Sequence, residues 1–443
     1  MYVTADKLTE RLDVLAARYG PPLRYVVAWS GGRDSSALLH ALLTSSRTRD
    51  TPLAAVHVNH HLQAAANDWQ AHCEREAGAL GVTFKALQAP VPDNPPGGTE
   101  AAARHLRYEA LSRLLEPGDW LLSAHHRKDQ AETLLLNVMR GSGIAGLAGI
   151  GEFQPLGAGH LVRPMRDVPA ALIADYAAQH ELRWVQDPSN DDTAFDRNFL
   201  RHEVLPLLES RWPAAVTSLA RSTVLAGEAE SLLAELAALD LAQAGDPACM
   251  DTGVLMSLSE PRRRNLLRHA IRELGLPLPP ARKLERIAAE LLPARADARP
   301  LVQWPGGEAR RYRSRLYLGA PLPAVPDAPD HRLVAGTNLA LGDGLGELQL
   351  VPGVGGITPA LAASGLAIRF RAGGEMLRPT GRDHTHALKK LLQEAAILPW
   401  MRSRLPLFYA DDDLVAEADL LIADAHYDPA RHGLQWNGKP PLH

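Results

Sequence analysis

The chain has little cysteine: only Cys73 and Cys249 occur among its 443 residues. Two isolated cysteines exclude a disulfide framework and a Cys-x-x-Cys metal or redox site. The sequence also lacks any run of about 18 apolar residues, so no membrane-spanning helix and no membrane partner is expected. The first residues show no apolar segment typical of a signal peptide, and we therefore expect a cytoplasmic protein.

The chain also lacks a strong charge of either sign, with a formal net charge of −4 at pH 7. A near-neutral protein has no overall attraction to nucleic acid, so any such surface must be local. Hydrophobic residues make up 46% of the chain and charged residues 22%, which is typical of a globular protein. The length predicts about two to four domains.

Strand-like and helix-like segments alternate over residues 1–212, which we expect to form the first domain. This alternation predicts an α/β fold with a doubly wound, mostly parallel sheet. In such sheets, ligands bind at the carboxyl ends of the strands. The expected strands cover residues 25–29, 53–58, 81–87 and 120–124.

The rest of the chain has a different character. Residues 213–355 are expected to form a mostly helical middle domain with short β segments, including helices over 226–244 and 260–274. Residues 366–424 are expected to form a small, basic α+β C-terminal domain.

A phosphate-binding loop is predicted where the first strand ends, at Ser30-Gly31-Gly32-Arg33-Asp34-Ser35. Glycines let the backbone approach an oxyanion, and the N–H groups of the following helix favour negative charge. Asp34 would repel a phosphate unless Mg²⁺ lay between them, so the motif predicts a metal-bound nucleotide pyrophosphate. A Walker A loop is excluded because its lysine is missing. The alternative is a simple strand-to-helix turn with Asp34 as a helix cap.

A second group of polar residues follows the strand that ends at Ala124. Asp129 and Glu132 are three residues apart, so they share one face of the predicted helix over 129–140. Paired carboxylates beside a phosphate site suit Mg²⁺ binding or the handling of an amine nucleophile. The alternative is that acidic residues simply favour the first turn of a helix.

Two other patterns are weighed as sites. Residues 141–146 fit G-x-G-x-x-G, but they follow a helix instead of opening one, so we reject a dinucleotide fingerprint. His57, His60 and His61 lack an accompanying carboxylate or cysteine at ligand spacing, which disfavours zinc. Their role stays open.

The loop at 30–35 resembles the SGGxDS signature of the PP-loop, or N-type ATP pyrophosphatase, superfamily. An ordered set of further motifs closely resembles the tRNA-isoleucine lysidine synthetase family, over nearly the whole chain. The motifs are Thr99–Tyr108, Ala124–Thr133, Arg140–Gly143, Asp187–Asn190, Arg197-Asn198, Arg201, Gly374–Pro379 and Lys389–Glu394.

The resemblance implies a ligase that forms a carbon–nitrogen bond. With ATP and Mg²⁺, it would adenylate the C2 oxygen of the wobble cytidine in the CAU-anticodon isoleucine tRNA, and the amine of L-lysine would displace AMP from C2 to give lysidine. Ser30, Gly31, Gly32, Arg33, Asp34 and Ser35 would hold ATP, with Asp34 on Mg²⁺. Asp129 and Glu132 match the acidic catalytic pair of the family, and Arg104 matches its functional arginine. A homodimer is considered as an assembly.

Two residues depart from the family pattern. Trp29 stands where a small or aliphatic residue is expected, and Ala124 stands where glycine is usual. Either change could reshape the nucleotide pocket.

A local basic segment supports an RNA partner. Between Gly365 and Leu405, eight Lys or Arg face only three acidic residues. The basic residues are Arg369, Arg371, Arg378, Arg382, Lys389, Lys390, Arg402 and Arg404. This surplus predicts binding to the phosphate backbone of tRNA. The alternative is a solvated helix face.

Three other functions compete. A PP-loop tRNA thiolase would activate a base in the same way, but it usually needs cysteines that this chain lacks. An amidotransferase-type ligase would need a glutaminase domain. A non-catalytic tRNA-binding protein would not need the intact set of Ser30, Asp34, Asp129 and Glu132.

Overall fold

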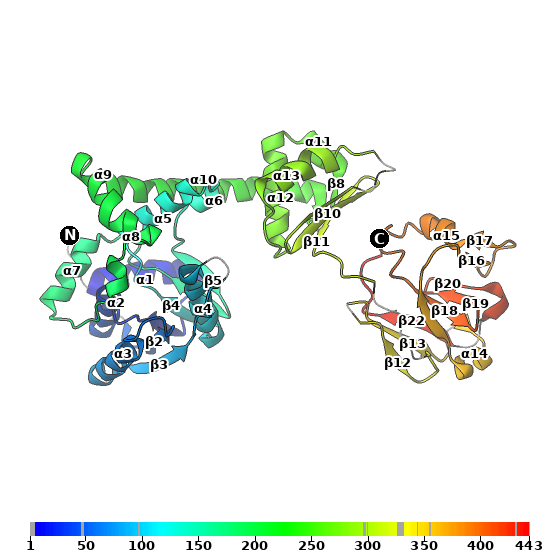
Figure 1. The fold of residues 1–443 in the computed structure, drawn as a ribbon, viewed down its shortest axis with the longest axis horizontal. Coiled ribbons are helices and arrows are strands. Elements are labelled where there is room, and N and C mark those ends of the chain that lie inside the picture. The colour runs from blue at the N-terminus through cyan, green and yellow to red at the C-terminus, as the bar shows by residue number, and fades with distance from the viewer. Residues whose placement is uncertain are drawn as a thin grey trace. The chain divides into compact units, whose positions relative to one another are not determined.

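The structure is a computed structural model that describes residues 5–45, 48–95, 98–295, 298, 300–325, 332–342, 344–353, 356–429 and 432–442 (Figure 1). The chain folds as two compact units, which divide between Leu233 and Ala234. Each unit buries its own clusters of apolar side chains.

A six-stranded sheet forms the centre of the first unit, in the order β3-β2-β1-β4-β6-β5. All neighbouring pairs are parallel except β5 and β6, which form an antiparallel hairpin at one edge. This topology confirms the predicted doubly wound sheet. The strands are β1 (Arg24–Ala28), β2 (Leu53–Asn59), β3 (Thr83–Gln88), β4 (Asp119–Leu122), β5 (Phe153–Leu156) and β6 (Gly159–Val162).

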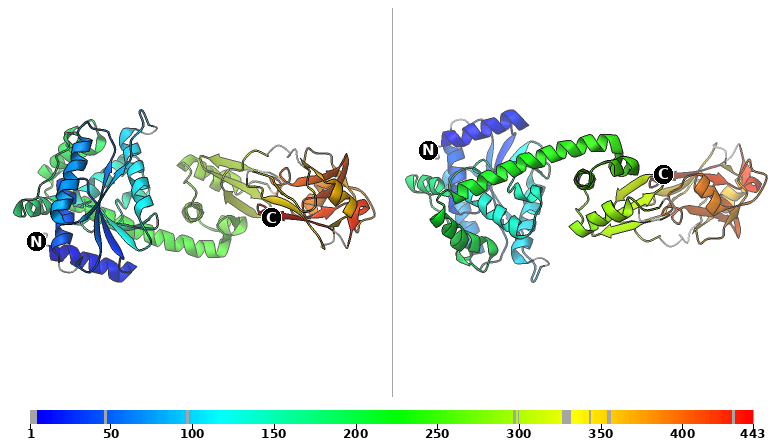
Figure 2. Two further views of the ribbon diagram at one scale, coloured as in Figure 1. Left: turned by 90° about the horizontal axis from the view of Figure 1, so that it is seen from below. Right: turned by 90° about the horizontal axis from the view of Figure 1, so that it is seen from above.

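Helices cover both faces of this sheet (Figure 2). Successive residues of a strand point to opposite faces, so Tyr25 and Val27 pack with helices α1, α2, α3 and α7, whereas Val26 packs with Leu111 of α4. The helices of this unit are α1 (Ala5–Tyr19), α2 (Arg33–Thr44), α3 (Ala66–Leu80), α4 (Thr99–Leu114), α5 (Arg127–Met139), α6 (Ile144–Leu147), α7 (Ala170–Gln179), the 3-10 helix η2 (Pro188–Asp191), α8 (Asp196–Phe199), the π-helix η3 (Leu200–Val204) and α9 (Leu205–Arg211).

Helix α5, which carries the acidic pair, begins two residues earlier than predicted. His126 is its N-cap residue, and Asp129 accepts a hydrogen bond from the backbone N–H of His126. The helix ends at Met139, and Gly141 has a φ of +66°, a left-handed conformation that favours glycine. The glycines after α5 therefore end a helix, which confirms that they are not a dinucleotide fingerprint.

The second unit begins within the long helix α10 (Ala215–Ala244) and continues with an antiparallel sheet in the order β7-β8-β11-β10-β9. Its core is formed by this sheet, by the end of α10 and by the helices that follow α10. The strands are β7 (Gly245–Asp246), β8 (Cys249–Asp251), β9 (Leu301–Trp304), β10 (Gly307–Tyr312) and β11 (Arg315–Gly319), and the helices are α11 (Thr252–Ser257), α12 (Glu260–Glu273), α13 (Ala281–Arg286) and the π-helix η4 (Ile287–Leu291).

The C-terminal part of this unit is rich in short strands. Its core runs from Leu333 to Leu442, and β13 pairs with β22 near the end of the chain. The strands are β12 (Asn338–Ala340), β13 (Glu347–Val351), β14 (Gly356–Ile357), β15 (Ala367–Phe370), β16 (Met376–Leu377), β17 (His386–Ala387), β18 (Pro406–Ala410), β19 (Asp413–Glu417), β20 (Leu421–Ile422), β21 (Tyr427–Asp428) and β22 (Gly433–Asn437), and the helices are α14 (Pro359–Ser364), α15 (Leu388–Glu394) and the 3-10 helix η5 (Asp424–His426).

Candidate active site

The Ser30–Ser35 loop leads from β1 into α2, at the carboxyl edge of the sheet. Gly31 has a φ of +80°, and a Cβ there would lie 2.8 Å from Sγ of Cys73 and 3.0 Å from Cγ2 of Val185. The carbonyl oxygen of Gly31 also accepts a hydrogen bond from the backbone N–H of Val185, at 2.8 Å. Glycine is therefore required here both by backbone conformation and by close packing.

Hydrogen bonds within the loop hold it as a cradle. The hydroxyls of Ser30 and Ser35 lie 3.1 Å apart, and Ser35 also donates to the carbonyl oxygen of Gly32 at 3.0 Å. No side chain caps the first turn of α2. An uncapped helix N-terminus directs its N–H groups and its positive dipole end at one spot, which suits a phosphate.

His126 lies between two carboxylates at the edge of this cradle. Its Nε2 is 3.4 Å from Oδ2 of Asp34, and its Nδ1 is 3.3 Å from Oδ2 of Asp129. Burial acts to raise the pKa of Asp34, but the hydrogen bond and charge of His126 and the charge of Arg33 outweigh burial and lower that pKa. Burial likewise opposes the charged form of His126, but Asp34 and Asp129 raise its pKa overall. The loop and the acidic pair therefore belong to one charged cluster.

Two arginines bind the acidic pair. Arg197 donates from Nε to Glu132 at 2.7 Å and from Nη2 to Asp129 at 3.0 Å. Arg201 donates from Nε to Glu132 at 2.7 Å and from Nη2 to Asp129 at 3.2 Å. The Glu132 side chain is fully buried. Although burial opposes ionisation, the positive charges of His126 and Arg197 keep the pKa of Asp129 below its usual value.

The segment before these arginines is fastened at several points. The buried amide of Asn198 donates to the carbonyl oxygens of Ser189, at 2.8 Å, and Asp192, at 2.9 Å. Asp187 caps η2 through the backbone N–H of Ser189. In the sequence, Arg197 and Arg201 belong to a motif, and the motif alone predicts no partner for either side chain. Their four-residue spacing, which places both on one helix face, was the available signal.

Arg104 lies apart from these ion pairs. It is exposed on α4, with its guanidinium 5.1 Å from the centre of the Tyr108 ring. Burial lowers the pKa of His125 to about 3, and the charges of Arg163, Arg197 and Arg104 contribute to this shift. His125 is therefore neutral near pH 7, and Arg104 lies within electrostatic range of the residue that precedes His126.

The histidine cluster does not converge on a metal. His57 Nδ1 lies 3.0 Å from the carbonyl oxygen of Trp29, His60 Nδ1 lies 3.0 Å from that of Ala89, and His61 Nε2 lies 2.6 Å from Gln88 Oε1. Within the described residues, no group of three or more His, Cys, Asp or Glu side chains could hold a metal ion.

The two departures from the family pattern have packing roles. Trp29 lies in the core, where its Nε1 donates to the hydroxyl of Ser36 at 3.0 Å and its ring meets Phe84 edge-on. Ala124 packs against the same core cluster. Trp29 is therefore a buried packing residue that binds α2 through Ser36, and it does not line an open pocket.

The two cysteines are poorly suited to the sulfur transfer that a thiolase carries out. Cys73 is completely buried, and its burial raises its pKa to about 12. A thiol in this state forms almost no thiolate at neutral pH. Cys249 lies on β8 in the second unit.

Most cations of the basic segment have partners within the C-terminal part. Arg371 pairs with Glu375, Arg378 with Asp424 and Arg382 with Glu394, at 3.1, 2.7 and 2.8 Å. Lys389 and Lys390 on α15 have no ion pair among the described residues. A second basic segment was not predicted from the sequence: residues 251–317 hold 14 Lys or Arg against 7 Asp or Glu.

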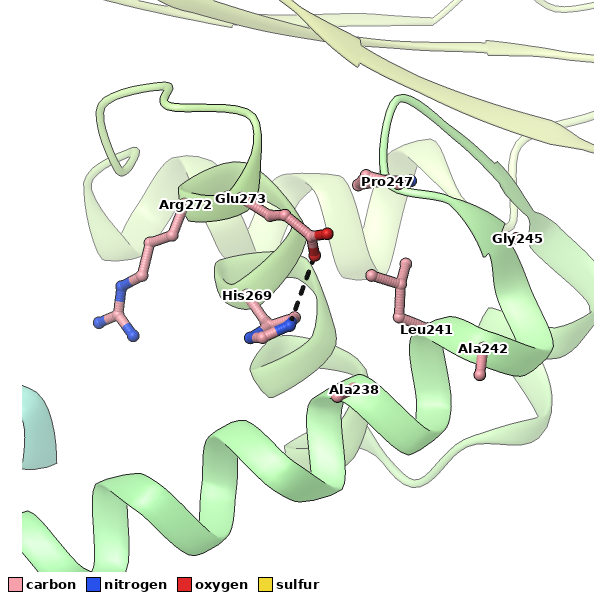
Figure 3. Close-up of a pocket in the computed structure, with 8 residues that line it drawn as sticks. All are labelled: Ala238, Leu241, Ala242, Gly245, Pro247, His269, Arg272 and Glu273. Atoms are coloured by element: carbon pink, nitrogen blue, oxygen red, sulfur yellow. Dashed lines mark ion pairs between the residues drawn. The ribbon is translucent and has the colours of Figure 1, made fainter. Parts of the chain in front are cut away.

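A cavity of about 780 Å³ lies in the second unit (Figure 3). Its floor is apolar and includes Leu241 and Pro247, whereas His269, Arg272 and Glu273 of α12 form a charged wall. His269 Nε2 lies 3.5 Å from Glu273 Oε2. None of the predicted site residues lines this cavity, so its size does not mark it as the reaction centre.

Three sequence families match the chain in order. They are described as the PP-loop domain, over residues 5–208, the TilS substrate binding domain, over 251–317, and the TilS substrate C-terminal domain, over 366–437. Proteins named tRNA(Ile)-lysidine synthase match nearly the full length. The one from Alkalilimnicola ehrlichii is 42% identical over 94% of this chain and 93% of its own length. Those from Methylococcus capsulatus and Serratia proteamaculans are each 41% identical, over 90% and 94% of this chain and 92% and 95% of their own.

The chain belongs to the tRNA(Ile)-lysidine synthase family. Membership confirms the prediction of an ATP-using ligase of tRNA modification, and the thiolase alternative is the weaker one. It also confirms the order expected for a lysidine synthase, a PP-loop domain followed by two further family-specific regions. In the part of the chain that the structure describes, no helix is both long enough and apolar enough to cross a bilayer.

Proposed function

We propose that this lysidine synthase uses ATP and Mg²⁺ to adenylate the wobble cytidine of a CAU-anticodon isoleucine tRNA, and that L-lysine then displaces AMP. In the first step, O2 of the cytidine attacks the α-phosphorus, the O2–Pα bond forms, the bond from Pα to the bridging oxygen breaks and pyrophosphate leaves with that oxygen. In the second, the lysine amine attacks C2, the C2–O bond breaks and AMP leaves with that oxygen. The observation that carries the proposal is the continuous cluster of Asp34, His126 and Asp129 beside the phosphate cradle.

The Ser30–Ser35 loop would hold the phosphates of ATP through its hydroxyls and the N–H groups of α2. Asp34 suits Mg²⁺ because it is ionised, partly exposed and at the rim of the cradle. Mg²⁺ in nucleotide sites is usually held by one or two carboxylates together with substrate phosphates. When bound, the ion would offset negative charge on the phosphates. Arg104 is an exposed cation on α4 that would face the charge developing at the α-phosphate.

Asp129 and Glu132 would receive the lysine ammonium and accept a proton from the amine before attack. Both carboxylates are already bound to Arg197 and Arg201. The proposed role therefore requires that an arginine contact be exchanged for the ammonium. Since an arginine and a lysine ammonium carry the same charge, the exchange would preserve the charge balance of the buried cluster.

The basic segments of the second unit would hold the tRNA. We assign this role to the domain over residues 366–424. In chain order it follows the catalytic domain over 1–212 and the middle domain over 213–355. Lys389 and Lys390 are its best placed cations because their charges are not compensated by an ion pair among the described residues. A homodimer and a cytoplasmic location stay predictions.

AMP formation from ATP and the tRNA, with lysine withheld, tests the adenylation step. The wild-type enzyme should form AMP only when the tRNA carries the CAU anticodon. Asp34→Asn should abolish AMP formation with little change in thermal stability, because this side chain is partly exposed and the amide oxygen of asparagine can still accept a hydrogen bond from Nε2 of His126. Near-normal AMP formation by Asp34→Asn would refute its role. Because Gly32 is the N-cap of α2 and no side chain caps that helix, a large loss of stability would instead show that Asp34 acts mainly through its pair with His126.

A further inference from the structure

His60 holds Arg107 through a neutral nitrogen. Nδ1 of His60 lies 3.0 Å from the carbonyl oxygen of Ala89, and Nε2 lies 3.3 Å from Nε of Arg107, which donates. A carbonyl oxygen can only accept, so the His60 proton resides on Nδ1 and Nε2 offers a lone pair. Burial lowers the pKa of His60, and the charge of Arg107 lowers it further. His60 is therefore an uncharged acceptor that orients a guanidinium.

Arg107 thus differs from the other arginines of the site. Arg33, Arg197 and Arg201 are each bound to a carboxylate, which cancels much of their charge. Neither Arg104 nor Arg107 forms an ion pair with a carboxylate among the described residues. A neutral partner fixes the direction of Arg107 and leaves its full positive charge available.

The surroundings of Arg107 disfavour its positive charge. Partial burial of the guanidinium lowers its pKa, and the charge of Arg104, one helical turn away on α4, lowers it as well. The residue as a whole still has surface open to solvent, from which an anion can approach. Two like charges held close together, without an opposing carboxylate, are stabilised when an anion binds between them.

Arg107 lies at the same edge of the sheet as the phosphate cradle. Its partner His60 directly follows β2, and β2 pairs in parallel with β1, which leads into the Ser30–Ser35 loop. On β2, Nδ1 of His57 lies 3.0 Å from the carbonyl oxygen of Trp29, the residue immediately before Ser30. Burial lowers the pKa of His57, and the charge of Arg107 lowers it further. Arg107 and the loop therefore both lie at the carboxyl edge of the sheet.

We infer that Arg107, oriented by the neutral ring of His60, is a phosphate-binding residue that acts together with Arg104. This assignment rests on the proposed function and gives the histidine cluster a role other than metal binding. The ligand is a phosphate group, supplied either by ATP or by the backbone of the tRNA. The four free Nη hydrogens of the guanidinium match the geometry of phosphate oxygens.

Two substitutions of His60, by glutamine and by glutamate, separate phosphate binding from a structural role, because the two new side chains have the same shape and differ only in charge. His60→Gln keeps a neutral acceptor, whereas His60→Glu places a carboxylate against Arg107. If Arg107 binds phosphate, the carboxylate should neutralise it and weaken binding about tenfold, as should Arg107→Gln, while His60→Gln should cost less than about threefold. If Arg107 only supports the fold, His60→Glu should be tolerated at least as well as His60→Gln, because a salt bridge replaces the hydrogen bond. His61→Gln and His61→Glu are the matched controls one residue further on.

The full-length variants should be compared for ATP affinity without tRNA, for tRNA affinity at two salt concentrations, and for thermal melting. Weaker ATP binding would identify ATP as the source of the phosphate; weaker tRNA binding with a shallower salt dependence would identify the tRNA backbone. Unchanged affinity for both ligands in Arg107→Gln and His60→Glu would overturn the inference, as would equal effects of His60→Glu and His60→Gln. If Arg107→Gln has a much lower melting temperature than the wild type, the comparison of His60→Gln with His60→Glu still tests whether Arg107 binds phosphate. None of these measurements requires lysine transfer, so failure of the proposed reaction would be seen separately.

Discussion

Arg201 binds Glu132 through a bidentate ion pair, with Nε 2.7 Å from Oε1 and Nη2 2.9 Å from Oε2. Because Arg197 shares the same carboxylate, one fully buried glutamate neutralises parts of two guanidinium groups. Glu132 is therefore both a proposed participant in the reaction and an anchor of the helix that faces α5. These two roles predict separate consequences of its removal.

Glu132→Gln should reduce lysine transfer more than adenylation and should also destabilise the first unit. A neutral amide can neither pair with an ammonium nor accept its proton, and it leaves two arginines without a buried counter-charge. Removing one partner of a buried ion pair costs about 3 kcal/mol. Thermal melting and separate assays of AMP formation and lysine transfer would measure both effects. Glu109→Gln, which loses an exposed pair with Arg113, is the control and should change stability by less than about 1 kcal/mol. A Glu132→Gln enzyme with normal lysine transfer would contradict the role of the acidic pair.

Gly31→Ala should lose ATP binding. The new methyl group would meet Sγ of Cys73 at 2.8 Å, and the backbone would be held at a φ of +80° that alanine disfavours. Adding Cys73→Ala should recover part of the loss, since it removes the contact but not the backbone strain. The control is Gly78→Ala within α3, where nothing lies within 4 Å and alanine should stabilise by up to about 1 kcal/mol. Calorimetric titration with ATP is the measurement, and wild-type affinity in Gly31→Ala would show that the loop conformation is not required.

Glu417→Gln should stabilise the C-terminal part at alkaline pH. The Glu417 side chain is fully buried, and neither carboxyl oxygen has a hydrogen-bond partner among the described residues. Burial raises its pKa to about 8; Asp419 raises it further and Arg371 opposes the shift. A carboxyl pKa raised above its unfolded value weakens folding as pH rises through the folded value. The wild type should therefore lose stability between about pH 5 and pH 8, and Glu417→Gln should lose less. Melting temperatures of both proteins across this pH range are the measurement. The same change of melting temperature with pH in both proteins would contradict the prediction.

Lys389→Gln combined with Lys390→Gln should weaken tRNA binding and leave ATP binding unchanged. Each lost phosphate contact should lower the slope of log affinity against log salt by about one. Substitution is a cleaner test than deleting residues from 365 onward, because deletion would also remove β22 from its pairing with β13. Lys439→Gln is the control, since Lys439 is already paired with Asp419. If the double variant and the wild type had equal slopes of log affinity against log salt, α15 would not be part of the tRNA-binding surface.

Local patterns were sufficient to predict the parts of the site that lie on single elements. The alternation of strands and helices predicts the sheet, and the spacing of Asp129 and Glu132 predicts their common helix face. The partners of these residues could not be predicted in this way, because Arg197 lies 65 residues beyond Glu132 and Arg107 lies 47 beyond His60. The periodicity of the sequence predicts which face of a helix or strand a residue lies on. It does not predict which side chain, distant in the sequence, contacts that residue. Short β segments were predicted within residues 213–355, but their pairing into the sheet of β7–β11 was not, since β8 pairs with β11 across the helices that separate them in the chain.

Transfer of labelled lysine to a CAU-anticodon isoleucine tRNA tests the central claim most directly. With ATP and Mg²⁺, the label should become attached to the tRNA and remain after alkali treatment, because lysine is joined to the base and not through an ester. Transfer should require the CAU anticodon and should release AMP and pyrophosphate. Label that alkali removes, incorporation of sulfur in its place, or no transfer to any CAU-bearing tRNA would contradict the account.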